Sequence, residues 1–381
     1  MYALAAERTQ VAKLDDQILA LERSLSALWA QRTLIQKRLD SYKYPVLTLP
    51  NEIVSEIFVH FLPVYPDRPP LTGVLSPTNL TQICRKWRDI ALTTPALWRA
   101  ASLSIDDMGG ISTPFAQQLH ELDEWLSRSR CCPFSVEIEE LSPSVERDFI
   151  LSSARCARWE HLAVFLMNRP FLAIDGPLPI LRDFVLEIEN LGFEDLIVFL
   201  EAPLLRSATL NDMALGAVDL PWAQLTSLTL QRVFPAECNP VLQKTPNLVH
   251  CKLNLVTNID DTRPWSVVTL PRLESLTLVP FNVFPNMVPG YLETLIVPAL
   301  RELQIAERIL DSPIDSLTSF ISKSGCKLQG MYICWMRKVS KDAYCRAFPS
   351  VRLSFDESFV GEGADVAPSS DVEKDSDSEQ E

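Results

Sequence analysis

The stretch Pro271-Arg-Leu-Glu-Ser-Leu-Thr-Leu278 is one copy of a short pattern that recurs in this 381-residue chain. Each copy has a proline, an apolar residue two positions later, and further apolar residues near the end of a predicted short strand. The other copies begin at Pro179, Pro203, Pro246 and Pro298, and a variant at Gln224-Leu-Thr-Ser-Leu-Thr-Leu230 has its Pro221 two residues further back.

The predicted strand ends recur at a nearly regular spacing. They fall at Leu166, Leu186, Leu210, Leu230, Leu253, Leu278 and Ile305, with weaker copies at Val136/Ile138, Ile333 and Leu353. A period of about 20 to 27 residues resembles that of leucine-rich repeats, in which each unit adds one strand to a parallel sheet. The expected fold is therefore mixed α/β, with a leucine-rich-repeat-like solenoid of parallel strands over 106–355. Its returning helices are expected at Glu194–Leu200 and Ile314–Lys323.

The N-terminal segment 1–43 follows a heptad repeat and predicts a coiled-coil helix. Nine of the eleven core positions between residues 4 and 39 are apolar. The a positions are Leu4, Val11, Ile18, Leu25, Arg32 and Leu39, and the d positions are Glu7, Leu14, Leu21, Leu28 and Ile35. The apolar stripe needs a partner surface, which is either a second copy of the chain or the chain's own next domain.

The segment 44–105 predicts a compact module of three helices. Pro50 suits a first helical turn, and Glu52 lies near the positive end of that helix. Prolines from Pro63 to Pro77 interrupt the chain before a second helix, and Leu97-Trp98 begins a short third one. The apolar face of the first helix is Ile53, Ile57, Phe58, Phe61 and Leu62; that of the second is Leu80, Ile83, Cys84, Trp87, Ile90 and Ala91. A further helix is expected at about 114–129.

Three blocks of this module closely resemble the F-box. They are Leu49-Pro50-Asn51-Glu52-Ile53-Val54-Ser55-Glu56-Ile57-Phe58, then Ile83-Cys84-Arg85-Lys86-Trp87, then Leu97-Trp98. They follow the order LPxEIxxxIF, VCRxWR and LW, and the proline-rich insert is the departure from that pattern. With the heptad helix before it and the helix to Ser129 after it, the arrangement looks like the large F-box families of mushroom-forming fungi.

The resemblance implies a docking function. F-box modules bind the Skp adaptor of cullin–RING ubiquitin ligases and present a substrate that the downstream domain holds. Carried over residue by residue, the adaptor surface would be formed or supported by Leu49, Pro50, Ile53, Ile57, Phe58, Cys84, Trp87, Leu97 and Trp98. The substrate surface is expected on the solenoid sheet, at positions between the strand leucines: Arg182, Thr209, Thr229, Lys252, Thr277 and Gln304.

Composition argues against several other classes of protein. The net charge is −14, but ten acids and one lysine lie in 356–381, so −9 belongs to this tail and −5 to the rest. Between residues 41 and 105 the net charge is +2 (six basic, four acidic residues), which is a poor match for nucleic-acid binding. The tail is expected to be disordered, either as a solubilising segment or as a kinase substrate at Ser370, Ser376 and Ser378.

No catalytic or metal-binding motif is found in the sequence. GxSxG, P-loop, HExxH and CxxC patterns are absent, so we expect no enzyme activity, no cofactor and no metal. The nine cysteines read as reduced thiols, and no signal peptide or apolar run of about 18 residues is present. The expected location is the cytoplasm or nucleus. The rival to a ligase receptor is a non-degradative scaffolding protein that assembles through the F-box or the heptad helix.

Overall fold

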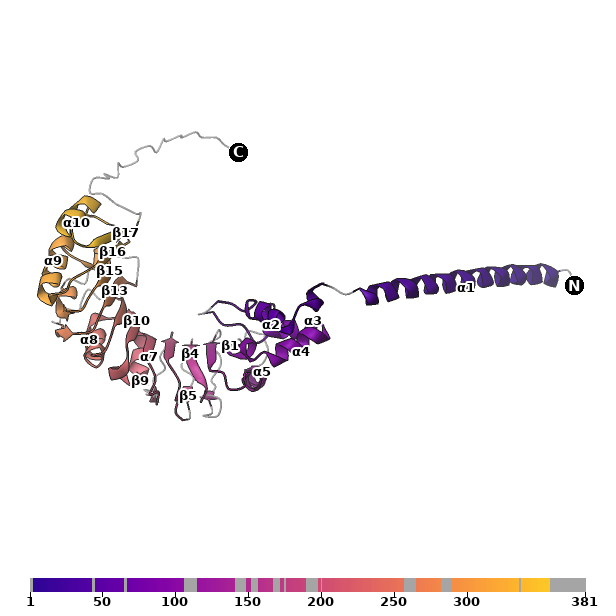
Figure 1. The fold of residues 1–381 in the computed structure, drawn as a ribbon, viewed down its shortest axis with the longest axis horizontal. Helices are drawn as coiled ribbons and strands as arrows, with labels where there is room; N and C mark the ends of the chain where they lie inside the picture. Colours follow the sequence, from indigo (N-terminus) through magenta and orange to yellow (C-terminus); the bar gives the residue numbers. More distant parts are fainter. Residues whose placement is uncertain are drawn as a thin grey trace, which may run out of the picture. The chain divides into compact units, whose positions relative to one another are not determined.

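The computed structural model describes most of the chain (Figure 1). The chain divides into two compact units. The described residues are 3–42, 45–64, 67–105, 115–140, 149–151, 157–166, 172–174, 176–189, 198–199, 201–256, 265–281, 290–335 and 337–356. Unit 1 comprises Met1–Phe61 and Leu80–Thr93, and unit 2 comprises Leu62–Asn79 and Thr94–Glu381. The predicted tail beyond Asp356 lies outside the described residues.

Unit 1 is helical. Its elements are α1 (Ala3–Ser41), the 3-10 turn η1 (Pro45–Thr48), α2 (Asn51–Val59), α3 (Leu80–Ile83) and α4 (Arg85–Thr93). The helix predicted from the heptads is confirmed as α1, and its side chains from Leu4 to Ser41 are all exposed. Among the described residues, no helix is both long and apolar enough to cross a membrane.

The second predicted helix of the three-helix module is broken, and the third is a single turn. A 3-10 turn, η2 (Pro77–Asn79), leads into α3, and Cys84 separates α3 from α4. The segment at Leu97-Trp98 is the 3-10 turn η3 (Pro95–Trp98), which is followed at once by a strand. The single continuous face predicted for the second helix is therefore wrong, and Ile83 is exposed while Leu80 and Ile90 are buried.

Unit 2 is built on one parallel sheet. Eleven strands of the described residues pair in the order β1 (Ala100–Ile105), β2 (Phe134–Glu140), β4 (Trp159–Leu166), β6 (Asp183–Ile188), β8 (Ser207–Asn211), β10 (Ser227–Val233), β11 (His250–Leu255), β13 (Ser275–Pro280), β15 (Glu302–Ala306), β16 (Gly330–Cys334) and β17 (Arg352–Phe355). Spatial order follows chain order, as expected when each repeat adds one strand. The predicted parallel sheet is confirmed, and it begins earlier than expected, at the end of the three-helix segment.

Two ladders of apolar side chains run across the sheet on its buried face. The strand pairing stacks Ala101, Val136, Leu162, Phe184, Ala208, Leu228, Cys251, Leu276, Leu303, Met331 and Leu353 in the first ladder. The second holds Leu103, Ile138, Val164, Leu186, Leu210, Leu230, Leu253, Leu278, Ile305, Ile333 and Phe355. Two predicted strand ends were misplaced, because Val164 and not Leu166 pairs with Leu186, and Phe355 and not Leu353 pairs with Ile333.

The recurrent proline starts a turn that leads into each strand. In the copy quoted first, the N–H of Leu273 donates to the carbonyl of Leu270. Pro271 is then the second residue of a four-residue turn, where its fixed φ is favourable. The same bond recurs from Leu181, Leu205, Leu248 and Leu300 to the residue three positions earlier, and Ala223 replaces the proline where Leu225 donates to Trp222.

The connections between strands differ from one another. They include α5 (Phe115–Arg128), α7 (Asp212–Ala217), α8 (Pro235–Gln243), α9 (Pro313–Ser324) and α10 (Lys341–Ala347), and the 3-10 turns η4 (Trp222–Gln224), η5 (Leu292–Thr294) and η6 (Glu307–Ile309). Three two-stranded sheets pair β3 (Phe149–Leu151) with β5 (Leu172–Ile174), β7 (Val198–Phe199) with β9 (Val218–Asp219), and β12 (Val268–Thr269) with β14 (Leu295–Ile296). Within unit 2, α8, α9 and α10 lie on the outer side of the strands (Figure 1).

Two of the predicted helices are confirmed and one is not. The helix expected at 114–129 is α5, and that expected at Ile314–Lys323 is α9. The helix predicted at Glu194–Leu200 is wrong where it is described, because Val198–Phe199 forms a strand. The remaining residues of that prediction lie outside the described residues.

The proline-rich insert is bound to the first two strands of the sheet. Pro70 forms a parallel bridge with Ser102, whose N–H donates to the carbonyl of Pro69. The guanidinium of Arg68 donates to Ser135 Oγ at 2.7 Å and to Glu137 Oε2 at 2.8 Å, and its side chain is nearly buried. The insert is thus a structural part of unit 2 that covers polar groups at the first edge of the sheet.

We expect the two faces of the sheet to respond oppositely to truncation. Leu253→Ala, in the middle of a buried ladder, should lower the free energy of unfolding by about 2–5 kcal/mol through lost burial and a residual cavity. Lys252→Ala, on the adjacent residue and the opposite face, should change it by less than about 0.5 kcal/mol. Urea denaturation of the full chain, followed by tryptophan fluorescence, measures both. Equal losses would contradict the assigned register.

Candidate functional site

Helix α2 carries apolar residues on two sides, and only one side is packed. Val54 and Phe58 point inward and are about 1% exposed. The rings of Phe58 and Trp87 meet edge to face, with their centroids 5.0 Å apart. Ile53 and Ile57 lie on another side of α2, and Phe61 lies in the turn just after it. These three residues follow at four-residue intervals and remain 50%, 49% and 36% exposed. We call these three residues the α2 stripe.

The start of α4 is fixed by Cys84 and Lys86. The carbonyl of Cys84 accepts from the N–H of Arg88 at 2.9 Å, and its sulfur accepts from the N–H of Trp87 at 3.5 Å. The ammonium of Lys86 donates to the carbonyls of Leu47 and Leu49 at 2.8 and 2.9 Å. These bonds join the turn before α2 to the helix that carries Trp87, so that α2 and α4 hold a defined relative position within unit 1.

Leu97 and Trp98 lie in the core of unit 2. Both are fully buried. The indole of Trp98 meets that of Trp125 on α5 edge to face at 5.3 Å, and the guanidinium of Arg128 lies 4.7 Å from the Trp98 ring. Leu97 and Trp98 can therefore support a docking surface only indirectly, by fixing the position of the turn at Pro95–Trp98.

The predicted adaptor residues thus fall into three groups. Ile53, Ile57 and Pro50 are exposed; Leu49, Cys84 and Trp87 are partly buried; and Phe58, Leu97 and Trp98 are buried. Sequence reasoning named Phe61 as part of a helix face but did not place it among the contact residues, although it extends the exposed stripe. The four-residue spacing of Ile53, Ile57 and Phe61 was the available signal.

The segment that contains α2, α3 and α4 is similar to a known protein family. Residues 46–104 match the family model described as F-box-like. On this similarity we call the segment the F-box-like domain. The match spans residues of both compact units, from the turn before α2 to the first strand of the sheet. A comparison with curated proteins finds no match to the chain.

The F-box-like domain is followed by a second candidate surface, on the exposed face of the sheet. Five of the six predicted substrate residues form one continuous row, because strand pairing places Thr209, Thr229, Lys252, Thr277 and Gln304 opposite one another in that order. We call them the polar row. Arg182 lies outside it: Val185 pairs with Thr209, and Arg182 precedes the strand and forms an ion pair with Glu160 at 3.1 Å.

An open hollow of about 440 Å³ lies over part of the polar row. Lys252, Thr277 and Gln304 line it together with two aromatic residues, Phe281 and Trp335. The guanidinium of Arg232 lies 5.7 Å from the Phe281 ring, and that of Arg308 lies 5.2 Å from the Trp335 ring. The surface therefore combines aromatic contact area with positive charge.

A buried acceptor of this hollow lacks a donor. The side-chain Oδ1 of Asn254, which lines the hollow, is buried and has no hydrogen-bond partner among the described residues. Because buried polar atoms in folded proteins are nearly always paired, this oxygen is an exception within the lining of the hollow.

The rim of the hollow is ordered by Asp356. Its carboxylate accepts from the hydroxyl of Tyr332, and from the N–H of Trp335 at 2.6 Å. The Tyr332 hydroxyl, then the Trp335 N–H, hold the pKa of Asp356 below its usual value. Because the pKa of Asp356 is lower in the folded chain, these contacts stabilise the fold at pH values above the pKa that the group has in the unfolded chain. That stabilisation is lost as the pH falls through the pKa of the folded state.

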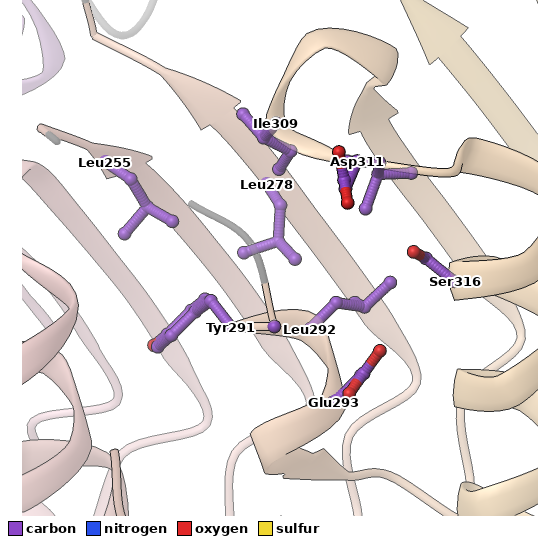
Figure 2. A pocket seen from close by; sticks show the side chains of 10 residues that line it. Leu255, Leu278, Tyr291, Leu292, Glu293, Ile309, Asp311 and Ser316 are labelled. Carbon is purple, nitrogen blue, oxygen red and sulfur yellow. The ribbon is translucent and has the colours of Figure 1, made fainter. Parts of the chain in front are cut away.

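A small cavity lies in the interior of unit 2. Figure 2 shows a cavity between the strand residues Leu255 and Leu278 and the segment around Tyr291 and Leu292. Its volume is about 10 Å³, room for about one water molecule. Among the described residues, no group of three potential ligands is placed to hold a metal ion.

The buried and exposed sides of α2 should be separable by mutation. Phe58→Ala should destabilise the F-box-like domain by about 3–5 kcal/mol, because it empties a packed site against Trp87. Ile57→Ala should cost less than about 0.5 kcal/mol, because half of its side chain is already exposed. Hydrogen–deuterium exchange of the peptides covering α2 and α4, read by mass spectrometry, would report both. Similar protection loss in the two variants would refute the assigned faces.

Proposed function

We propose that this protein is the substrate-receptor subunit of an SCF-type cullin–RING ubiquitin ligase. In this function the F-box-like domain binds a Skp-type adaptor, and through it the cullin, while the sheet of unit 2 binds the protein to be modified. The observation that carries the proposal is the exposed α2 stripe within an F-box-like domain. The protein itself would be non-catalytic, and would act in the cytoplasm or nucleus.

The α2 stripe has the physical properties of a docking surface. Ile53 and Ile57 project from a helix whose other side is already packed, and Phe61 projects from the turn that follows this helix. The exposed parts of these side chains contribute nothing to the unit's own core. Full burial of one such side chain is worth roughly 1.5–3 kcal/mol, and these residues would bury the half that is still exposed. A few such anchors are enough to determine a specific complex.

The sheet of unit 2 suits the binding of a target. We interpret the parallel sheet as a leucine-rich-repeat-like solenoid, in which the polar row lies on the face that remains open. The hollow supplies an ammonium at Lys252 and two aromatic rings, those of Phe281 and Trp335. Aromatic anchors beside positive charge fit a peptide segment of the target, with Arg182 outside the central contact.

A non-degradative scaffolding protein is the second candidate function. The continuous exposed stripe of α1 favours it, because a coiled coil could assemble chains without any ubiquitin transfer. The two functions differ in the consequence of adaptor binding: a receptor shortens the lifetime of its target, and a scaffold does not.

Adaptor binding can be tested with purified components. Ile57→Asp places a charge in the middle of the α2 stripe and should weaken binding to a Skp-type adaptor at least about a hundredfold, because the charge would be buried without a partner. Isothermal titration calorimetry of the full chain measures the affinity. Leu19→Asp on α1 is the matched control, since it alters an equally exposed apolar residue outside the F-box-like domain.

Two results would contradict the docking function. One is the absence of adaptor binding by wild-type protein whose circular dichroism shows it to be folded. The other is an equal loss of affinity in the Leu19→Asp control.

The target surface can be tested before the target has been identified. Thr277→Arg in the polar row should extend the lifetime of the same cellular proteins as Ile57→Asp, because each variant blocks one of the two contacts that a receptor needs. Quantitative turnover proteomics would identify the proteins stabilised by both. Thr269→Arg, at an exposed position of β12 outside the main sheet, is the control and should stabilise none of them. The absence of a shared set would count against the receptor function.

A further inference from the structure

The seam of α1 contains two charged residues among apolar ones. In the heptad of residues 4–39, Glu7 occupies a d position and Arg32 an a position, and the other core positions are Leu, Ile or Val. All of these side chains are exposed in the chain. The guanidinium of Arg32 lies 5.0 Å from the ring of Trp29, at an e position beside the seam.

We propose that α1 pairs with α1 of a second copy in an antiparallel coiled coil, with Glu7 of each copy facing Arg32 of the other. This proposal is independent of adaptor binding, because it uses none of the residues of the F-box-like domain.

Antiparallel pairing matches the seam from residue 4 to residue 35 and leaves Leu39 beyond the overlap. In an antiparallel coiled coil an a residue of one helix meets a d residue of the other, and both residues lie in one core layer. When Glu7 faces Arg32, the remaining layers consist of apolar pairs: Leu4 with Ile35, Val11 with Leu28, Leu14 with Leu25, and Ile18 with Leu21, each occurring twice. The two charged residues are thus the exceptions to an apolar core, and this alignment pairs them with each other.

Parallel pairing places like charges together. In a parallel, in-register dimer each core residue meets its own copy, so that Glu7 faces Glu7 and Arg32 faces Arg32. Each parallel dimer then contains two repulsive layers, one with two glutamates and one with two arginines. The charge pattern therefore selects the antiparallel orientation.

Other antiparallel registers leave the charges without partners. A shift of one heptad in one direction places Glu7 opposite Leu25 and leaves Arg32 beyond the overlap. A shift in the other direction places Glu7 opposite Leu39 and Arg32 opposite Leu14. A charge that is buried against leucine loses its hydration without compensation, so both shifted registers are less stable.

The remaining candidate partner is the chain's own next domain, but α1 buries none of its side chains from Leu4 to Ser41 against the other helices of unit 1. Every side chain of α1 from Leu4 to Ser41 is exposed, although α1 belongs to the same compact unit as α2, α3 and α4. Helix propensity alone contributes little stability to a helix that packs on no other part of a protein. A two-fold pair would cover the residues from 4 to 35, a length of about 48 Å at 1.5 Å per residue. A closed two-fold contact of this kind is the commonest form of self-association.

The pairing predicts a charge-swap pattern that only this alignment gives. Glu7→Arg alone, or Arg32→Glu alone, replaces two attractive layers of the dimer by two repulsive ones and should raise the dissociation constant at least about tenfold. The double variant Glu7→Arg, Arg32→Glu restores both attractive layers and should restore the wild-type dissociation constant. In a parallel dimer the three variants would each keep like charges together, and none would differ much from wild type.

Sedimentation equilibrium of the full chain and its variants measures these constants. Asp16→Arg and Arg23→Glu are the matched controls, since they make the same charge changes at f positions, on the outer side of the helix. A wild-type dimer that both single variants weaken, the double variant restores and the controls leave intact would support the pairing. A wild-type monomer at about 100 µM, single variants that dimerise as wild type does, or a double variant that stays monomeric would overturn it.

Circular dichroism and thermal unfolding of each variant check that the substitutions have not changed the fold of the rest of the chain. The substitutions lie on an exposed helix, so the unfolding transition of unit 2 should not move. Wild-type helicity should rise with protein concentration over the range in which the dimer forms, and a helicity independent of concentration in a dimeric wild type would also contradict the pairing.

Discussion

The stacking of apolar side chains across a parallel sheet is the interaction on which the larger unit depends. Each strand contributes two inward residues, as Cys251 and Leu253 do, and these meet the equivalent residues of both neighbouring strands. A single strand of four to eight residues could not bury such a surface alone, so each strand is stable only in its place in the series. Because side chains alternate along a strand, the same register that buries the ladders exposes the polar row on the other face. The candidate target surface is thus a consequence of the core.

The repeat could be predicted from sequence because its chemistry is local. The proline that starts each turn and the leucines that follow it lie within eight residues. The turn and the strand of Pro271–Leu278 can therefore both be predicted from that segment alone. The errors arose where the strand offered two choices. Val164 and Leu166 are both apolar and point to the same face, and only the pairing with Leu186 and Ile188 distinguishes them. Arg182 was misplaced for a similar reason, because the sequence does not mark where the strand after the turn begins.

The F-box-like domain was predictable in position but not in detail. On α2, Ile53, Val54, Ile57 and Phe58 are all apolar, and helical periodicity alone cannot say which pair faces the core. Packing against Trp87 decides it in favour of Val54 and Phe58. The structural role of the proline-rich insert could not be predicted either, because its ion pair joins Arg68 to Glu137, 69 residues away. A contact at that separation leaves no local pattern for a sequence to reveal.

The two exposed apolar surfaces of unit 1 encode specificity differently. The α2 stripe has no charge within it, so its partner must recognise shape and the polar residues around it. The seam of α1 carries one acid and one base, which contribute little affinity and exclude other orientations and registers. Because the surfaces share no residue, one chain could use both at once. In the proposed function, two chains joined at their N-terminal helices would then present two sheets, and a target with two matching segments would be held more tightly than either sheet could hold it alone.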